Sequence, residues 1–305
     1  ILFTRAIMEQ CPIKEMEIEF QCVIDTENSL FEPVPAKKVK PEWYKKLPAF
    51  VKDVEGNRLD TIKKCPAMHD WLSMGYLIRN RHTVLVLVHT HRGISKDNFY
   101  DEPVSLAIPL KDMSTEKLSY IKTLVKEEKT QAALDYIRTN KLDIHELTDL
   151  SSRPGGHPAR QVTGMSRDDK MQLKFKMDFL IETPKGTSCY YLDPFLFDNP
   201  YLSTWQGIID TDKFNQLTTN NHLIFYPKVD EPFIITKGTP LVQIVPFVRY
   251  PWKSKITYLT KKEITKKWEK AVKGDLKELN AREDIKNKVS EPYYAKKFKT
   301  RKEYS

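Results

Sequence analysis

Short apolar runs at strand spacing dominate the chain, and the clearest of them lie within 205–249. There, β-branched and aromatic residues recur at 205–212, 223–227 and 233–247. Segments containing Asn-Asn, Pro and Lys-Gly separate these runs, as is typical of strands joined by turns. The pattern predicts three or four β-strands in this stretch, and the rest of the chain is organised around them.

Four further stretches carry strand patterns. Residues 16–24 and 172–177 alternate between apolar and polar positions, which predicts half-buried strands. Residues 82–91 form a continuous apolar run, and such a run favours a strand buried on both faces. Residues 180–192 predict two strands joined by a turn at Pro184-Lys185-Gly186.

Helical spacing appears in one long stretch and one short stretch. Ser114 offers an N-cap, and apolar residues then recur every three or four positions as far as Ile137. This predicts two helices, inserted in a β protein at about 112–150. Pro66 and Gly75 bracket a further helix, because proline suits the first helical position and glycine suits the end.

Proline and glycine divide the remaining segments. Residues 31–48 hold four prolines, a spacing that forbids helix and central strand over most of this connector. Pro41 can begin one helical turn there. Residues 151–164, which include Gly155-Gly156, predict a loop. We therefore predict an α+β fold that is mainly antiparallel β, with a β-sandwich as one form of its core.

Positive charge is concentrated near the C-terminal end. The formal net charge is +9, and residues 261–305 hold fifteen Lys and Arg against eight Asp and Glu, so +7 lies there. We predict a β-rich core domain over 1–259 and a basic helical arm over 260–305. A simply solvated helix face is the alternative interpretation of the charge. The apolar residues of the arm form one helical stripe: Ile264, Trp268, Ala271, Val272, Leu276 and Leu279.

The last residues of the arm combine aromatic and lysine side chains. The candidate binding residues are Tyr293, Tyr294, Lys296, Lys297 and Phe298. A basic segment favours an acidic partner, so we expect this one to contact other proteins or neighbouring subunits of a homo-oligomer. Nucleic acid would also match the charge, but the sequence contains no DNA- or RNA-binding motif of known spacing.

Several chemistries have no motif in the sequence. The four cysteines include no Cys-x-x-Cys pair, which argues against a zinc site. The sequence contains no run of about 18 apolar residues, so it predicts no membrane span. The Gly155-Gly156 pair lacks the lysine of a phosphate loop. We therefore expect no cofactor and no membrane association.

Two histidines form a separate candidate site. His89 and His91 are two apart on a predicted strand, so both imidazoles would face the same side, as in some β-barrel metal sites. A third ligand would have to come from afar, and His157, Asp101 and Glu102 are candidates. We expect a structural role for the pair. A metal-dependent β-barrel enzyme is the alternative.

Asp210 and Asp212 form the second candidate site, and we expect them to share one side of a strand. Two close carboxylates raise the pKa of one member and can provide a general base or hold a divalent cation. The alternative, which we favour, is that they cap a tight turn before Lys213 and pair with Lys or Arg.

A family resemblance bears on Asp210. Segments 207–212 and 233–244 resemble the second half of the trimeric dUTPase and dCTP-deaminase fold. The resemblance implies a dUTPase-like β-clip or jelly-roll core, in which Asp210 would activate the attacking water of a nucleotide enzyme. The sequence lacks the Gly-Tyr-Asp-Leu and Arg-Ser-Gly motifs and the glycine-rich tail of these enzymes. Those differences argue against dUTP hydrolysis.

A second resemblance rests on the order of motifs along most of the chain. The motifs are 41–48, 61–66, 75–76, 156–158, 181–189, 207–212, 233–247 and 301–304. In this order they resemble a family of uncharacterised proteins of large tailed marine phages, including cyanophages. The resemblance implies a viral origin and a location in the virion or the host cytoplasm. Our leading interpretation is a non-enzymatic virion or assembly component that docks through its basic arm.

Overall fold

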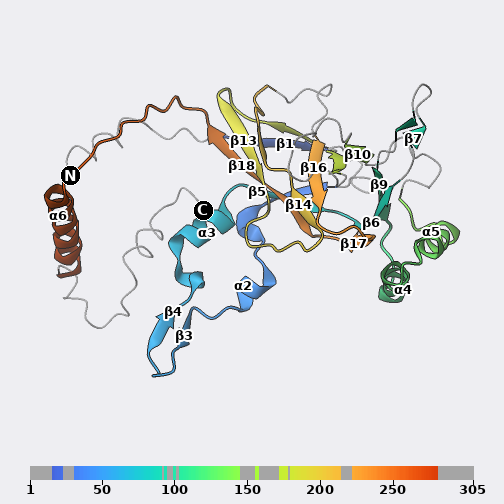
Figure 1. Ribbon diagram of the computed structural model, residues 1–305, viewed down its shortest axis with the longest axis horizontal. Coiled ribbons are helices and arrows are strands. Elements are labelled where there is room, and N and C mark those ends of the chain that lie inside the picture. Colours follow the sequence, from blue (N-terminus) through green and yellow to red (C-terminus); the bar gives the residue numbers. More distant parts are fainter. Residues whose placement is uncertain are drawn as a thin grey trace. The chain divides into compact units, whose positions relative to one another are not determined.

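The chain in the computed structural model, drawn in Figure 1, divides into two compact units. Unit 1 contains Ile1–Pro48 and His69–Arg249, and unit 2 contains Ala49–Met68 and Tyr250–Ser305. The residues that the structure describes are 16–22, 31–90, 93–94, 99–100, 103–144, 155–157, 172–177, 179–213 and 222–280.

Unit 1 is built mainly from antiparallel sheets, which confirms the predicted fold class. Its five-stranded sheet has the order β15 (Gly207–Ile209), β13 (Thr187–Leu192), β18 (Pro240–Val248), β5 (Tyr76–Asn80), β2 (Phe31–Pro35). The four-stranded sheet has the order β10 (Gly155–His157), β11 (Gln172–Lys176), β16 (His222–Pro227), β14 (Leu202–Thr204). The three-stranded sheet has the order β17 (Phe233–Ile235), β6 (Thr83–Thr90), β9 (Pro103–Leu110). The two-stranded pairs are β1 (Glu19–Cys22) with β12 (Phe179–Glu182) and β7 (Gly93–Ile94) with β8 (Phe99–Tyr100).

The predicted strands between 205 and 249 are β15 to β18, and β18 is the central one. It pairs with β13 on one side and with β5 on the other. Five consecutive residues, 241–245, are buried, so both faces of β18 are covered. β2 lies at the edge of the same sheet, where Pro33 and Pro35 are tolerated because an edge strand leaves one row of amides unpaired. The predicted connector over 31–48 therefore begins with an edge strand.

The main core joins side chains of the five-stranded and four-stranded sheets. Tyr191 of β13 and Ile244 of β18 contribute from the first sheet, and Leu173 of β11 and Phe225 of β16 contribute from the second. These side chains are at most 4% exposed. Burial of apolar side chains from both sheets is the main driving force for their packing.

Strand β6 is shared by two cores, as its continuous apolar run predicts. Val84 and Val86 belong to the main core. Leu85 and Leu87 belong to a second core, which also contains Ile121 and Ile137. Successive side chains of a strand point to opposite faces, so one strand can serve both cores.

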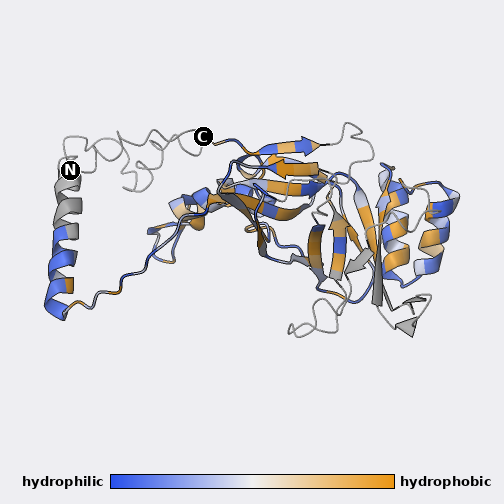
Figure 2. Cartoon of the chain, turned by 90° about the horizontal axis from the view of Figure 1, so that it is seen from above, coloured by the Kyte–Doolittle hydropathy of each residue, from blue (hydrophilic) through white to orange (hydrophobic). Residues whose placement is uncertain are grey.

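The helical insertion covers the second core. It consists of α4 (Thr115–Lys126) and α5 (Thr130–Thr139), where two helices were predicted. The Ser114 side chain accepts a hydrogen bond from the Lys117 amide and caps α4. Figure 2 shows both helices beside the three-stranded sheet, each with a polar and an apolar side.

Short helical elements lie before β5. They are η1 (Ala36–Lys38), α2 (Glu42–Lys46) and α3 (Pro66–Ser73), and the last two match the predicted helices. Gly75 ends this region with a φ of +70°. A Cβ atom at Gly75 would lie 2.0 Å from the carbonyl oxygen of Ile244. Only glycine therefore fits where the chain passes β18.

Unit 2 contains a hairpin and the C-terminal helix. The hairpin pairs β3 (Phe50–Lys52) with β4 (Arg58–Asp60), and η2 (Ile62–Lys64) follows. α6 (Lys261–Asn280) begins where the helical arm was predicted. The Thr260 hydroxyl and the Glu263 carboxylate bond each other's backbone amides, which forms a capping box. The rest of the predicted helical arm, 281–305, lies outside the described residues.

Two features differ from the expectation. The predicted loop over 151–164 contains β10, whose glycines pair with β11. The strand β9, over 103–110, was not predicted and pairs with β6. In both cases a distant strand supplies the backbone partner, and local turn or apolar signals do not contain that information.

Candidate functional site

The two candidate carboxylates lie in a turn at the end of β15. The expectation that Asp210 and Asp212 share one side of a strand is wrong, because the strand ends at Ile209. The Lys213 amide donates to the Asp210 carbonyl at 2.9 Å and closes the turn. The favoured alternative, a tight turn before Lys213, describes this backbone better.

Both carboxylates are bound by Arg249, which follows the last residue of β18. The Arg249 Nη1 atom lies 3.0 Å from Asp210 Oδ1. Its Nη2 atom donates to Asp212 Oδ2. Lys213 Nζ lies 4.0 Å from the other oxygen of Asp210. One guanidinium therefore bridges the two carboxylates, and such charge-assisted bonds are the stronger kind.

The turn between β12 and β13 joins the same cluster. The Thr187 backbone amide donates to the Pro184 carbonyl at 3.1 Å, and Gly186 has a φ of +87°. This is the turn that the Pro-Lys-Gly sequence predicts. The Gly186 amide donates to Asp212 Oδ2 at 2.8 Å, and the Gly186 carbonyl accepts from the Arg249 amide at 2.8 Å.

Ser188 completes the network. Its hydroxyl donates to Asp210 Oδ1 at 2.6 Å and accepts from Arg249 Nη1 at 2.6 Å. The same Arg249 atom also donates to the Thr187 carbonyl at 2.9 Å. The ends of β13, β15 and β18 are thus joined by one arginine, and we call this cluster the Arg249 latch: Gly186, Thr187, Ser188, Asp210, Asp212 and Arg249.

The electrostatics of the latch favour the charged forms. The hydrogen bond from Arg249 lowers the pKa of Asp212, against the opposing effect of its burial. The hydrogen bond to Asp212 likewise raises the pKa of Arg249. The Asp212 side chain is only 3% exposed. A buried carboxylate in this setting remains an ion that holds the turn.

This geometry limits the chemistry available to Asp210. A general base needs an oxygen that reaches a water or substrate proton. Asp210 Oδ1 already accepts from Ser188 and contacts Arg249, while Oδ2 faces Lys213 at 4.0 Å. The arrangement is suited to holding the ends of three strands together.

The other sequence candidates fall largely beyond the described side chains. His91 and the arm residues Tyr293, Tyr294, Lys296, Lys297 and Phe298 lie outside the described residues. For His89 the structure describes the β6 backbone. Among the described residues, no group of three or more His, Cys, Asp and Glu is arranged to hold a metal ion. No helix in the described ranges is long and apolar enough to cross a membrane.

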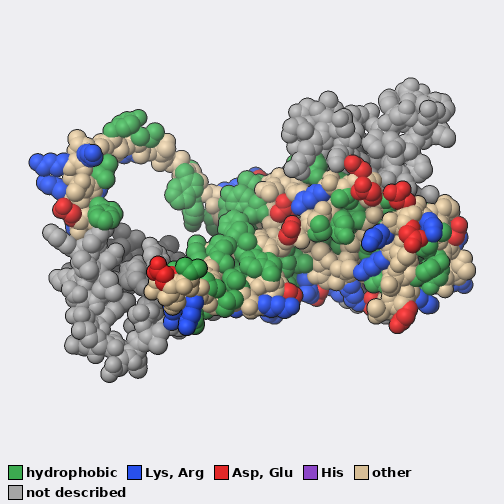
Figure 3. Space-filling view, turned by 60° about the horizontal axis from the view of Figure 1, so that its bottom comes forward, with side chains coloured by type: hydrophobic (Ala, Val, Ile, Leu, Met, Phe, Trp, Pro, Cys, Tyr) green, Lys and Arg blue, Asp and Glu red, His purple; other side chains and the backbone are tan. Residues whose placement is uncertain are grey.

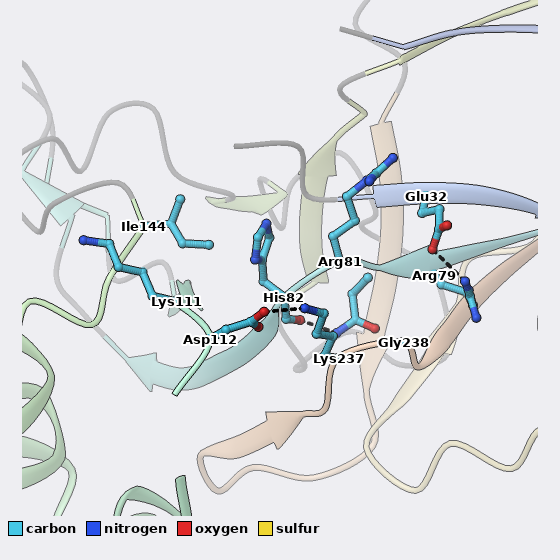
Figure 4. Close-up of a pocket in the computed structure, with 10 residues that line it drawn as sticks. Glu32, Arg79, Arg81, His82, Lys111, Asp112, Ile144, Lys237 and Gly238 are labelled. Atoms are coloured by element: carbon cyan, nitrogen blue, oxygen red, sulfur yellow. Dashed lines mark hydrogen bonds and ion pairs between the residues drawn. The ribbon is translucent and has the colours of Figure 1, made fainter. Parts of the chain in front are cut away.

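The expected pairing of the aspartates with Lys or Arg is present, but sequence reasoning did not identify the partner as Arg249. Arg249 lies 37 residues from Asp212 in the chain, and no local pattern connects them. A second arrangement was missed entirely. It is a basic pocket of about 610 Å³, lined by residues that include Asn80, Arg81 and Lys111 (Figure 4). Its residues come from segments far apart in sequence, so only a regional excess of positive charge could have indicated it.

Comparison of the sequence with protein-family models and with curated proteins gave no match.

Proposed function

We propose that this protein acts by binding another protein through its basic C-terminal arm, as a virion or assembly component of a phage. The observation that carries the proposal is the exposure of large apolar side chains just before and within α6. Each is at least 55% exposed: Trp252, Ile256, Tyr258, Ile264 and Trp268. Aromatic side chains left exposed in one segment are typical of protein-binding surfaces.

Charge and spacing indicate the kind of partner. Residues 250–270 contain seven Lys and two Glu, so an acidic surface would complement them. Ile264 and Trp268 are four residues apart on α6, which places them on one helix face. Figure 3 shows hydrophobic and Lys or Arg side chains interspersed along this part of the chain. A helix with adjacent anchors of this kind suits a groove on another protein.

The phage assignment rests on the order of sequence motifs described above. The Arg249 latch supports a binding role over the nucleotide-enzyme alternative, because Asp210 is held by Ser188 and Arg249. These contacts support a structural role for Asp210, and the exposed side chains just before and within α6 support the binding role of the arm.

Quantitative mass spectrometry of purified virions tests this proposal. We expect the full chain at a fixed copy number, and we expect Trp268→Ser to lower that number severalfold, because truncation of an aromatic anchor that an interface buries weakens binding. Val54→Ser is the matched control, since Val54 is fully exposed on the hairpin of unit 2. Absence of the full chain from virions, together with a monomer in sedimentation velocity, would contradict the proposal.

The enzyme alternative has its own measurement. Purified protein is incubated with each deoxynucleoside triphosphate and magnesium, and hydrolysis and deamination are followed. We expect no turnover. Turnover that disappears in Asp210→Asn, while the variant keeps the wild-type circular dichroism spectrum, would establish the nucleotide enzyme instead.

A further inference from the structure

Unit 2 has no hydrophobic core among the residues that the structure describes. Both cores lie in unit 1, and none of the described side chains of unit 2 is buried. Its exposed large apolar side chains come from two regions, residues 50–62 and residues 250–268. Small units gain their stability from buried apolar surface. This exposure therefore indicates a contact that the described part of the chain does not supply.

Residues 252–258 have the pattern of a strand that lacks a partner strand. Trp252, Ile256 and Tyr258 occupy alternate positions, with Lys253 and Lys255 between them, so the apolar side chains and the lysines lie on opposite sides of an extended chain. The three apolar side chains are 78% to 91% exposed. No backbone hydrogen bond joins this segment to the rest of the described chain. Figure 2 shows it as an extended ribbon in which hydrophobic and hydrophilic residues are interspersed.

The β3–β4 hairpin has the opposite deficiency, because it is a sheet of only two strands. Val51 pairs with Leu59, so both side chains lie on one face, and they are 43% and 49% exposed. The other face carries charged residues: Lys52, Arg58 and Asp60. An isolated two-stranded hairpin is marginally stable in water, and it needs a further strand or a cover on its apolar face.

The turn of the hairpin is nevertheless held by several hydrogen bonds. The Asp53 carboxylate accepts from the amides of Glu55 at 2.9 Å and Asn57 at 2.7 Å. The Asp53 amide donates to the Asn57 carbonyl at 3.0 Å. These bonds fix the register of the two strands before any partner arrives. The edges of the hairpin are therefore preformed, and a preformed edge lowers the cost of adding a strand.

We propose that residues 252–258 of one copy of this chain add as a third strand to the β3–β4 hairpin of a second copy. The apolar side of the segment covers Val51 and Leu59, and its two lysines extend the charged face of the hairpin into solvent. Each copy has one segment and one hairpin, so the exchange is reciprocal and closes as a two-fold dimer. This inference rests on the proposed function, because it names a partner for part of the same exposed region.

The buried area favours a second copy as the partner. An aromatic side chain buries about 150 to 250 Å² in an interface, and each segment offers Trp252 and Tyr258 in addition to Ile256. Reciprocal exchange uses two segments and two hairpins, which brings the total to the roughly 1,200 Å² or more of stable interfaces. One segment on the edge of an unrelated sheet would bury about half of that. Ile264 and Trp268 of α6 take no part, so they stay available to another protein.

Sedimentation velocity of the full chain from about 1 to 100 µM tests the proposal, and we expect a concentration-dependent dimer. Ile256→Lys on the segment and Leu59→Lys on the hairpin should each raise the dimer dissociation constant about tenfold or more, because each puts a charge into the apolar contact. Both side chains are exposed in the single chain, so the variants should keep the wild-type melting temperature. Ile208→Lys, at an exposed position of β15 in unit 1, is the matched control and should dimerise like the wild type.

A mixing experiment tests the exchange itself. The Ile256→Lys chain keeps an intact hairpin and the Leu59→Lys chain keeps an intact segment, so a mixed pair has one intact contact. We expect the mixed pair to associate more tightly than either variant does with itself. Absence of this recovery, or wild-type dimerisation in either variant, would overturn the proposal.

Two further outcomes would also overturn it. Loss of the dimer in Ile208→Lys would place the contact at the edge strand β15 instead. A wild-type chain that stays monomeric up to about 100 µM would exclude the exchange. In that case a fixed copy number in virions would leave the proposed function standing, because docking through α6 does not depend on the dimer.

Discussion

At the scale of single residues, the most informative feature is a charged side chain that holds backbone in place. Arg249 donates to Asp212 and to the Thr187 carbonyl, and it contacts Asp210 at 3.0 Å. The carboxylates that the sequence offers as a candidate site are thereby used for structure. Two aspartates at this spacing would also suit catalysis. The contact with Arg249 therefore indicates their structural role, and the aspartates alone do not.

The pH dependence of stability should report on Asp212. Its pKa is lowered in the folded state, so its charged form stabilises the fold above the unfolded-state pKa of about 3.9. That stabilisation is lost as the pH falls through the folded-state pKa. We expect Asp212→Asn to lower the free energy of unfolding most near pH 7 and less near pH 3, as measured by urea denaturation.

Asp135→Asn is the matched control for this experiment, because Asp135 is an exposed carboxylate on α5. Its stability difference from wild type should be small at either pH. An Asp212→Asn deficit that is equally large at both pH values would mean that the carboxylate charge does not stabilise the latch.

Gly75 gives a second prediction at this scale. Gly75→Ala should lower the free energy of unfolding by on the order of 3 kcal/mol or more, because the new Cβ meets the Ile244 carbonyl. Gly238→Ala shares the positive φ but has open space around it, and it should cost about 1 kcal/mol. Equal costs in thermal denaturation would show that backbone conformation, not the close approach, requires glycine at position 75.

At the scale of elements, β6 connects the two cores of unit 1. Its alternate side chains pack on the main core and on the helical insertion. The insertion is therefore not a separate appendage, because it covers one face of a strand whose other face is in the main core. Loss of packing between the helices and β6 should therefore also destabilise the sheet.

Ile137 tests this coupling. It is 0% exposed on α5 and belongs to the second core. Ile137→Ala should lower the free energy of unfolding by about 2 to 5 kcal/mol, and Ile137→Val by about 0.5 to 1.5 kcal/mol. We expect one cooperative transition in both variants by tryptophan fluorescence and far-ultraviolet circular dichroism. Separate melting of the helices would show that the insertion is an independent unit.

At the scale of the whole molecule, charge and core are separated along the chain. The segment 261–305 carries +7 of the net charge of +9, whereas both hydrophobic cores lie in unit 1. Stability and association should therefore depend on different segments. Ionic contacts are screened by salt, and buried apolar contacts are not.

Deletion of residues 290–305 tests that separation. We expect the melting temperature to change by less than about 2 °C, because the two cores that the described residues form lie within unit 1. The deletion should weaken association with the partner. Raising the salt concentration should weaken association of the full chain more than that of the truncated chain, because the deleted residues supply ionic contacts that salt screens. Failure of the truncated chain to fold would assign the last residues to the core.

The sequence by itself determined the local elements of this protein. Alternating apolar positions placed β11, Ser114 placed the start of α4, and the Pro-Lys-Gly turn placed Gly186 between two strands. These signals succeed because the period of a strand, a helix cap and a turn each depend on a few neighbouring residues.

Only the tertiary structure decided which distant residues meet. It paired the glycines of β10 with β11, gave Asp210 and Asp212 an arginine that follows β18, and gathered Arg81 and Lys111 around one pocket. Each of these contacts depends on sheet order and strand register, which long-range burial selects and which local sequence does not encode. The residue types of the site were therefore visible in the sequence, while their partners, and with them their role, were fixed by the packing of the sheets.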